Sequence, residues 1–173
     1  MKLFVVLGLA VGATLTFACS STADAECVAG RACSCADCNK TCGGNGKECS
    51  FACTGGTCNF TCTGGGCQAE AKNAAAVSLD CPGGGCSLTS SATSSSTIAC
   101  AGDRCQHTCS GAQSCKTTQC KSGCQTSCNG ATTCESSCTA TSGGCQVDGQ
   151  TGATPIPTGG ETTPVPPVPG AGD

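Results

Sequence analysis

One short phrase, two cysteines separated by three residues, recurs along most of this 173-residue chain. The first residue after the leading cysteine is usually polar, and Thr or Ser usually precedes the closing one. The phrase occurs at Cys38–Cys42, Cys49–Cys53, Cys58–Cys62, Cys105–Cys109, Cys124–Cys128 and Cys134–Cys138, and two further copies, at Cys67 and Cys86, keep only the first cysteine. A chain built on such a repeat is expected to fold as a row of similar units.

The composition provides no material for an ordinary apolar core. The chain has 23 Cys and 26 Gly, but only four Phe and no Trp or Tyr. Cross-links must therefore replace much of the apolar burial that stabilises other proteins. The small net charge of -3 argues against nucleic acid or an anionic membrane surface as a partner.

The N-terminus predicts export, because Lys2 is followed by an apolar run over residues 3–17. One interpretation is a signal peptide over residues 1–25, cleaved after Ala23-Asp-Ala25. The alternative is a lipoprotein signal over residues 1–18 with Cys19 lipidated, since Thr16-Phe-Ala-Cys19 resembles a bacterial lipobox, although Thr16 stands where an aliphatic residue is usual. We expect either a secreted protein or an outer-membrane lipoprotein whose only membrane contact is its lipid anchor. Both alternatives leave 22 cysteines, an even number that suits complete pairing in an oxidising compartment.

The mature chain divides into three segments by spacing and composition. Residues 26–48 form an irregular Cys-rich segment whose cysteine spacing differs from that of the later residues. Residues 49–148 are periodic, with rows of about 19 residues that start at Cys67, Cys86, Cys105 and Cys124. Residues 149–173 are rich in Pro, Thr and Gly, and we expect this tail to be disordered.

Each row contains two extended segments in which inward and outward residues alternate. The predicted inward positions of the Cys-flanked segments are Phe51, Phe60, Ala69, Leu88, His107 and Thr126. A helix over residues 69–77 is the alternative for the Ala-rich stretch, although the neighbouring rows align through it. Most of the turns carry Gly two residues after a Cys, where a tight corner with positive φ is expected, at positions 44, 55, 64, 83, 102, 111 and 130.

Rows of strand, turn, strand and turn predict an all-β, disulfide-rich fold. The fold class is a narrow two-sided β-solenoid with coils of about 19 residues, flanked by disordered ends. The competing architecture is an irregular disulfide mesh with little regular structure.

The cysteine spacing excludes pairing within one strand, because two residues four apart in a strand are separated by about 13 Å. Two alternatives are left: pairing across a turn, as in Cys81 with Cys86, and pairing between neighbouring coils, as in Cys109 with Cys128. Cysteines on the two sides of one turn are present or absent together, which favours the first alternative without excluding the second. The candidate disulfide cysteines are Cys42, Cys49, Cys53, Cys58, Cys62, Cys67, Cys81, Cys86, Cys100, Cys105, Cys109, Cys115, Cys120, Cys124, Cys128, Cys134, Cys138 and Cys145.

The alternative chemistry for so many thiols is metal sequestration. Cys33-Ser-Cys35-Ala-Asp-Cys38 contains C-x-C and C-x-x-C spacings, and in its Cys content and lack of aromatics the chain resembles metallothioneins. It departs from that family because C-x3-C and C-x4-C spacings dominate and Lys is sparse. We therefore predict no metal or other cofactor, and we expect His107, the only His, to be packed in the interior.

No motif indicates catalysis, so the chain is interpreted as a non-enzyme. We expect an exported, disulfide-stapled structural or binding module at the cell surface, with an unknown extracellular ligand. The outward Thr, Ser, Asn and Gln ladders resemble those of the disulfide-stacked solenoids of insect antifreeze proteins, which makes ice or glycan binding a further alternative, with Thr61, Thr89 and Thr108 as test positions. The leader, the Cys19-Ser-Ser start and the repeat style resemble those of uncharacterised Cys-rich secreted proteins and lipoproteins of bacteria with large genomes, myxobacteria among them, and that resemblance implies no activity.

Overall fold

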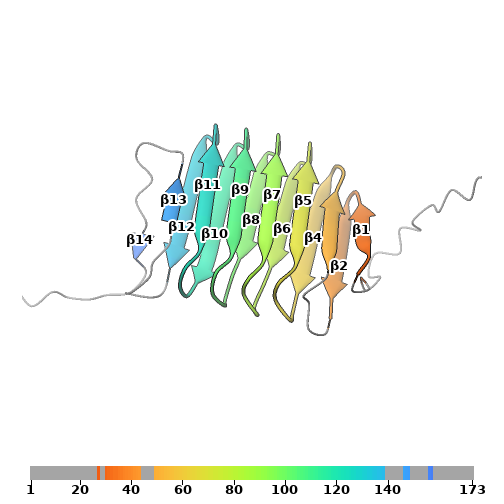
Figure 1. The fold of residues 1–173 in the computed structure, drawn as a ribbon. Helices are drawn as coiled ribbons and strands as arrows, with labels where there is room; N and C mark the ends of the chain where they lie inside the picture. Colours follow the sequence, from red (N-terminus) through yellow and green to blue (C-terminus); the bar gives the residue numbers. More distant parts are fainter. Residues whose placement is uncertain (1–26, 28–29, 44–48, 139–145, 149–155, 158–173) are drawn as a thin grey trace, which may run out of the picture.

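The computed structural model describes Cys27 and residues 30–43, 49–138, 146–148 and 156–157. In this part of the chain all regular structure is β, and the strands form two parallel seven-stranded sheets. The chain alternates between the sheets, so the odd-numbered strands form one sheet and the even-numbered strands the other (Figure 1). The predicted two-sided β-solenoid is confirmed, with about six turns of roughly 19 residues.

The two sheets are called the odd sheet and the even sheet. In spatial order the odd sheet contains β1 (Ala32–Cys35), β3 (Ser50–Cys53), β5 (Gln68–Lys72), β7 (Ser87–Ser91), β9 (Gln106–Ser110), β11 (Gln125–Asn129) and β13 (Gln146–Asp148). The even sheet contains β2 (Cys38–Cys42), β4 (Thr57–Cys62), β6 (Ala76–Asp80), β8 (Ser95–Ala99), β10 (Ser114–Cys120), β12 (Thr133–Cys138) and β14 (Ile156–Pro157).

The helical alternative for residues 69–77 is wrong, because this stretch holds strand β5, a turn and the start of β6. In β5, Ala69 and Ala71 are buried, whereas Gln68, Glu70 and Lys72 are exposed. This alternation has a period of two, and β5 pairs in register with β3 on one side and β7 on the other. Hydrogen bonds to both neighbours outweigh the helix propensity of alanine.

The prediction that residues 26–48 are irregular is wrong for the described residues of that segment. Strand β1 pairs with β3, and β2 pairs with β4, so residues 32–42 form the first coil of the solenoid. The spacing conceals this coil because only two residues separate Cys35 from Cys38, whereas four separate Cys53 from Cys58. The shorter turn shifts β2 out of the 19-residue rows without changing its pairing.

Two residues of the C-terminal tail, 156 and 157, are described and form β14, which extends the even sheet beyond β12. The paired residues are Ser137 with Ile156 and Cys138 with Pro157. Proline is tolerated here because β14 is the last strand of the sheet. The rest of the tail, like the predicted signal segment with Cys19, lies outside the described residues.

The interior changes from apolar to polar along the axis of the solenoid. In the even sheet the central inward ladder runs Phe60, Leu79, Ile98, Thr117 and Ser136. In the odd sheet the corresponding ladder runs Phe51, Ala69, Leu88, His107 and Thr126, and these residues are buried as predicted. Phe60 belongs to the even sheet, and its ring stacks on that of Phe51 with centroids 4.6 Å apart. Burial of these few apolar side chains stabilises the N-terminal coils.

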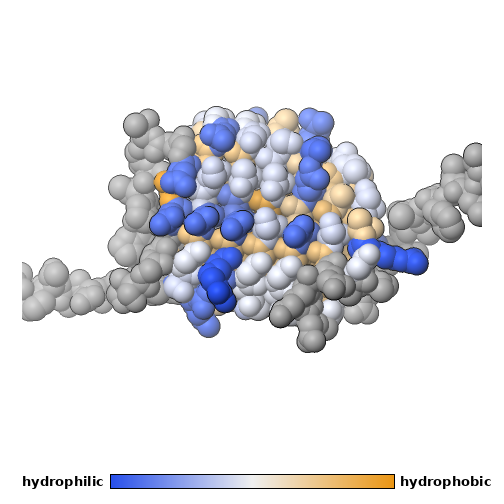
Figure 2. All heavy atoms as spheres, viewed as in Figure 1, coloured by the Kyte–Doolittle hydropathy of each residue, from blue (hydrophilic) through white to orange (hydrophobic). Residues whose placement is uncertain are grey.

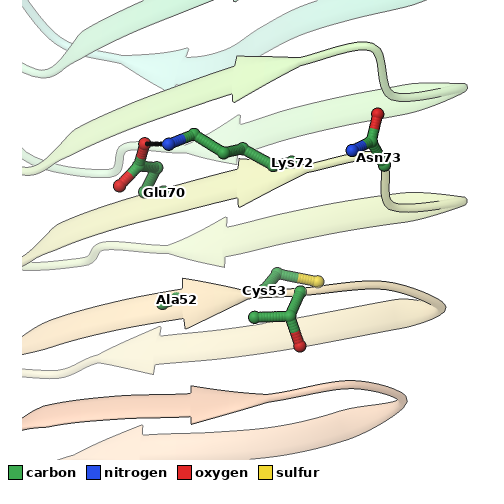
Figure 3. A pocket seen from close by; sticks show the side chains of 6 residues that line it. Ala52, Cys53, Glu70, Lys72 and Asn73 are labelled. Atoms are coloured by element: carbon green, nitrogen blue, oxygen red, sulfur yellow. Dashed lines mark ion pairs between the residues drawn. The ribbon is translucent and has the colours of Figure 1, made fainter.

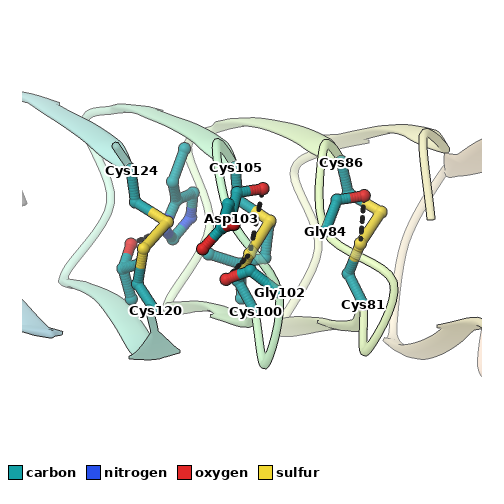
Figure 4. The surroundings of a disulfide bond; sticks show 12 residues. Cys81, Gly84, Cys86, Cys100, Gly102, Asp103, Cys105, Cys120 and Cys124 are labelled. Atoms are coloured by element: carbon teal, nitrogen blue, oxygen red, sulfur yellow. Dashed lines mark hydrogen bonds between the residues drawn. A yellow bond between two sulfur atoms is a disulfide. The ribbon is translucent and has the colours of Figure 1, made fainter. Parts of the chain in front are cut away.

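The turns from the even sheet back to the odd sheet stack backbone against backbone (Figure 4). A Cβ atom on Gly83 would lie 2.6 Å from the backbone nitrogen of Gly65, and one on Gly84 would lie 2.6 Å from that of Asp103. Neighbouring coils are about 4.8 Å apart, so a side chain does not fit between such turns. The predicted positive φ occurs at Gly111 and Gly130. The prediction is wrong for Gly55, Gly64 and Gly83, where positive φ lies one position later, as at Gly84 (76°), and for Gly102, whose turn has positive φ at Arg104.

The close stacking of these turns predicts a large effect of Gly84→Ala. The new Cβ would overlap the Asp103 backbone and force alanine into a left-handed conformation, so we expect the free energy of unfolding to fall by about 2–3 kcal/mol. Gly55→Ala is the matched control, because nothing lies within 4 Å of a Cβ at Gly55 and its φ is not positive. Denaturant unfolding of the oxidised proteins, followed by circular dichroism, measures both. Equal midpoints for the two variants would contradict the stacking argument.

Candidate functional site

All 21 cysteines in the described part of the chain are disulfide-bonded. Of the two alternatives from the sequence, the structure contains pairing across turns. The pairs are Cys27–Cys33, Cys35–Cys38, Cys42–Cys49, Cys53–Cys58, Cys62–Cys67, Cys81–Cys86, Cys100–Cys105, Cys109–Cys115, Cys120–Cys124 and Cys128–Cys134. Cys138 is bonded to a cysteine outside the described residues, where the candidate Cys145 also lies.

The disulfides form two ladders along the solenoid. The even-to-odd ladder closes the turns from even to odd strands, and Figure 4 shows three of its rungs at Cys81–Cys86, Cys100–Cys105 and Cys120–Cys124. The odd-to-even ladder closes the opposite turns and is interrupted for two coils, where Ala71 and Val77, and then Ser90 and Ser96, take the place of cysteines. Among the described turns, the disulfide ladder is therefore complete on one edge of the solenoid and partial on the other.

Five groups of side chains bring three possible metal-ligand atoms within 4.8 Å of one another. Each group contains both sulfurs of a disulfide and a third atom from a neighbouring side chain, as in His107 with Cys109 and Cys115. Cysteine binds metals as the thiolate, and sulfurs joined in a disulfide do not provide it. In the oxidised protein these groups are therefore parts of the disulfide ladders rather than metal centres.

His107 is the centre of a buried polar chain at the boundary between the apolar and polar halves. Its Nε2 lies 2.8 Å from Ser96 Oγ, and its Nδ1 lies 3.1 Å from Thr117 Oγ1. Thr117 Oγ1 in turn lies 2.8 Å from Thr126 Oγ1. These hydroxyls satisfy both ring nitrogens inside the protein, where an unpaired polar group would be costly. In the C-terminal coils these hydrogen-bonded side chains take the place of an apolar core.

The Ser96–His107 contact has the distance of a nucleophile–base pair but not the setting of one. Ser96 is 0% exposed and His107 1% exposed, so a substrate has no access to the hydroxyl. The other ring nitrogen faces Thr117 instead of a carboxylate that would stabilise a protonated ring. This pair holds the core together and does not form an accessible catalytic site.

Burial lowers the pKa of His107 to about 4, because the charged ring would lose its hydration. The unfolded chain, with an ordinary histidine pKa near 6.5, binds this proton more readily than the folded protein. We therefore expect the free energy of unfolding to be highest above pH 6.5 and to fall by about 3 kcal/mol as the pH drops to 4.

Urea unfolding at several pH values measures this dependence, with His107→Leu as the variant that cannot titrate at this position. In the variant, the free energy of unfolding should no longer fall between pH 6.5 and pH 4 through this group, whatever the variant's absolute stability. A slope identical to that of the original protein would show that His107 does not cause the dependence.

The outer faces of the sheets are ladders of polar side chains. On the odd sheet one ladder runs Gln68, Ser87, Gln106, Gln125 and Gln146, and beside it runs another of Glu70, Thr89, Thr108, Ser127 and Asp148. Figure 2 shows one face of the molecule, on which hydrophilic and near-neutral residues prevail. Thr61 lies on the even sheet, beside Thr41 and Asp80. The three test threonines therefore do not form one array, because only Thr89 and Thr108 are neighbours.

The even sheet uses several of its outward side chains in bonds within the protein. Asn59 Nδ2 donates to Asn39 Oδ1 at 2.8 Å, and Ser78 Oγ donates to Asn59 Oδ1 at 2.9 Å. Lys116 forms an ion pair with Glu135 at 2.9 Å. Among the described residues, by contrast, no hydrogen bond within the protein engages the side chains of Gln106 and Gln125 on the odd sheet.

The odd sheet is hollowed near its N-terminal end, where small side chains lie next to long ones. Ala32, Ser50 and Ala52 line one open depression together with Gln68 and Glu70. A second depression lies beside the ion pair between Lys72 and Glu70, whose Nζ and Oε1 are 2.7 Å apart (Figure 3). Both are open to solvent and are lined by apolar as well as polar atoms, so neither encloses a small molecule.

No helix in the described part of the chain is long and apolar enough to cross a membrane. Comparison with known proteins gives no match to any protein family, to any curated protein or to any solved structure.

Proposed function

We propose that the protein is an exported structural or binding module that presents the outer face of the odd sheet to an extracellular ligand. The observation that supports this proposal is the division of roles along each strand: inward residues form disulfides and a small core, and outward residues form regular ladders of polar groups. Extensive disulfide bonding is typical of exported proteins. A secreted form and an outer-membrane lipoprotein both fit this location.

The odd sheet is the better candidate for the binding face because its side chains have unused hydrogen-bonding capacity. Gln106 and Gln125 are exposed neighbours in one ladder, and Thr108 and Ser127 are neighbours in the next. Each glutamine offers two donors and one acceptor oxygen, and each hydroxyl offers one donor. Four such groups on adjacent strands, about 4.8 Å apart, provide a flat and nearly uncharged array.

A neutral, hydroxyl-rich polymer is the ligand class that this array fits best. The absence of charge on Gln106, Thr108, Gln125 and Ser127 gives no attraction for an ionic ligand. The mature chain also offers no exposed aromatic ring among its described residues, since Phe51 and Phe60 are both buried. The affinity would therefore come from many weak hydrogen bonds repeated along an extended polysaccharide.

Binding of the oxidised protein to a panel of immobilised neutral polysaccharides tests this proposal. Thr108→Tyr places a bulky ring in the middle of the odd sheet, and we expect it to weaken binding at least tenfold. Thr97→Tyr is the matched control, because Thr97 is an outward, half-buried threonine in the middle of the even sheet. Equal loss in both variants, or no binding by the original protein, would count against the odd sheet as a glycan-binding face.

Metal sequestration is the alternative function, and the close sulfur groups such as Cys62, Cys67 and Cys86 are the observation that favours it. The two functions require opposite states of the thiols. We expect the intact mass of the protein from its native host, denatured and alkylated without reductant, to show no added alkyl groups. Many added groups would indicate free thiols and favour metal binding. The same spectrum distinguishes a lipid on Cys19 from a soluble chain that starts at Glu26.

A further inference from the structure

The disulfide between Cys35 and Cys38 differs from the others in the described part of the chain. It closes a C-x-x-C sequence, Cys35-Ala-Asp-Cys38, and its sequence separation of 3 is the smallest among these disulfides. Both of its cysteines are half-buried, whereas each of the other described pairs contains at least one buried cysteine. It therefore combines the spacing of redox-active dithiols with partial access to solvent.

The position of this disulfide also favours access. It joins β1 to β2, which are the terminal strands of the two sheets at the N-terminal end of the solenoid (Figure 1). The intervening residues, Ala36 and Asp37, are exposed. Asp37 Oδ1 accepts a hydrogen bond of 2.7 Å from the backbone nitrogen of Thr57, so the turn is attached to the second coil by a bond that does not involve sulfur.

A second disulfide lies within reach of the first. The Sγ atoms of Cys35, Cys38 and Cys58 lie within 4.8 Å of one another, and Cys58 is bonded to Cys53. Cys38 and Cys58 are also register partners on neighbouring strands, as are Cys35 and Cys53. Parallel strands are about 4.8 Å apart, which is within the Cα separation that a disulfide spans. These four cysteines can therefore pair within coils or between coils without a change of fold.

No cysteine of the next coil adds to these four, because Cys53 and Cys58 are followed in register by Ala71 and Val77. Two coils without cysteines at these positions separate the set from Cys109–Cys115, the next rung of the odd-to-even ladder. Exchange that begins at Cys35–Cys38 is thus confined to four cysteines along this ladder.

We propose that Cys35–Cys38 is a thiol–disulfide exchange site whose substrates are external dithiols, with Cys53–Cys58 as its internal partner. A thiolate of the dithiol attacks one sulfur of Cys35–Cys38, the S–S bond breaks, and the other cysteine leaves as a thiolate and takes up a proton. The second thiol of the reagent then releases the mixed disulfide, so the reagent is oxidised by two electrons and the protein holds two thiols. This inference goes beyond the proposed binding function and does not depend on it.

The internal step follows from the same chemistry. The thiolate of Cys38 attacks Cys58 Sγ, the Cys53–Cys58 bond breaks, and Cys53 leaves as a thiolate and is protonated. The product holds a Cys38–Cys58 disulfide between coils and thiols at Cys35 and Cys53. The number of thiols is unchanged, so this step needs no further reductant.

Limited reduction of the native protein tests the site. The oxidised protein is treated with one equivalent of dithiothreitol, quenched in acid, alkylated and mapped by mass spectrometry. We expect the first label on Cys35, Cys38 and Cys53, at least tenfold faster than on Cys128 and Cys134, the matched pair with one half-buried cysteine at the other end of the described solenoid. Label that appears first elsewhere, or on all cysteines together, would overturn the proposal.

A single-cysteine variant tests the internal step. Cys35→Ser leaves Cys38 as a thiol, and we expect its oxidised form to contain some Cys38–Cys58 disulfide with a free thiol at Cys53. In the control, Cys128→Ser, the half-buried Cys134 also has a cysteine, Cys115, as its register partner, but no group of three sulfurs within 4.8 Å of one another includes Cys134 among the described residues. The free thiol should therefore stay at Cys134. A free thiol found only at Cys38 would exclude the internal step. Should Cys35→Ser fail to fold, limited reduction of the original protein still decides whether the site exists.

Discussion

The spacing of about 4.8 Å between coils is the constraint on which the structure depends. Every residue lies directly above and below its counterparts in neighbouring coils, so each position must suit a whole ladder. At the stacked even-to-odd turns around Gly83 this leaves room only for backbone, which explains the contact of Gly83 with Gly65. At the strand ends it permits a sulfur pair, as in Cys81–Cys86. The sequence is repetitive because equivalent positions in successive coils have the same surroundings.

Disulfides and apolar packing compensate for each other along the axis. The two coils that lack an odd-to-even disulfide contain the aliphatic side chains of Val77, Leu79, Leu88 and Ile98. The coils on their C-terminal side have a hydrogen-bonded interior around His107 and contain both kinds of disulfide. Each disulfide typically contributes about 2–4 kcal/mol, comparable to the burial of one large aliphatic side chain. Each coil from β3 to β10 thus has an even-to-odd disulfide together with either aliphatic packing or an odd-to-even disulfide. The coil of Phe51 and Phe60 has an odd-to-even disulfide as well as packed apolar side chains.

The parts of the fold that could be predicted from sequence are those set by periodicity. The alternation of buried and exposed residues gave the strands and the inward position of His107, because a strand has only two faces. The first coil was missed because its turn at Cys35–Cys38 is two residues shorter than that at Cys53–Cys58, and a count of residues does not reveal strand pairing. The assignment of Thr61 and Thr108 to one array failed because the repeat phrase occurs in both sheets. The hydrogen bonds of Ser96 and Thr117 to His107 have no signal in the sequence, since they join residues of three strands.

Geometry alone does not explain why the disulfides lie within coils. Several cysteines, such as Cys115 and Cys134, are register partners on neighbouring strands, and a bond between them would close a loop about three times longer than the bonds observed. Chain entropy would favour the longer loop by about 1 kcal/mol. The bond within a coil has a different advantage, because it forms between residues 3 to 7 apart and needs no neighbouring coil. Each coil can therefore be closed as soon as its turn exists, and the solenoid can be assembled coil by coil. The alternative pairing stays within reach of exchange, and the four cysteines of the first two coils are where the sulfur contacts and partial exposure make it accessible.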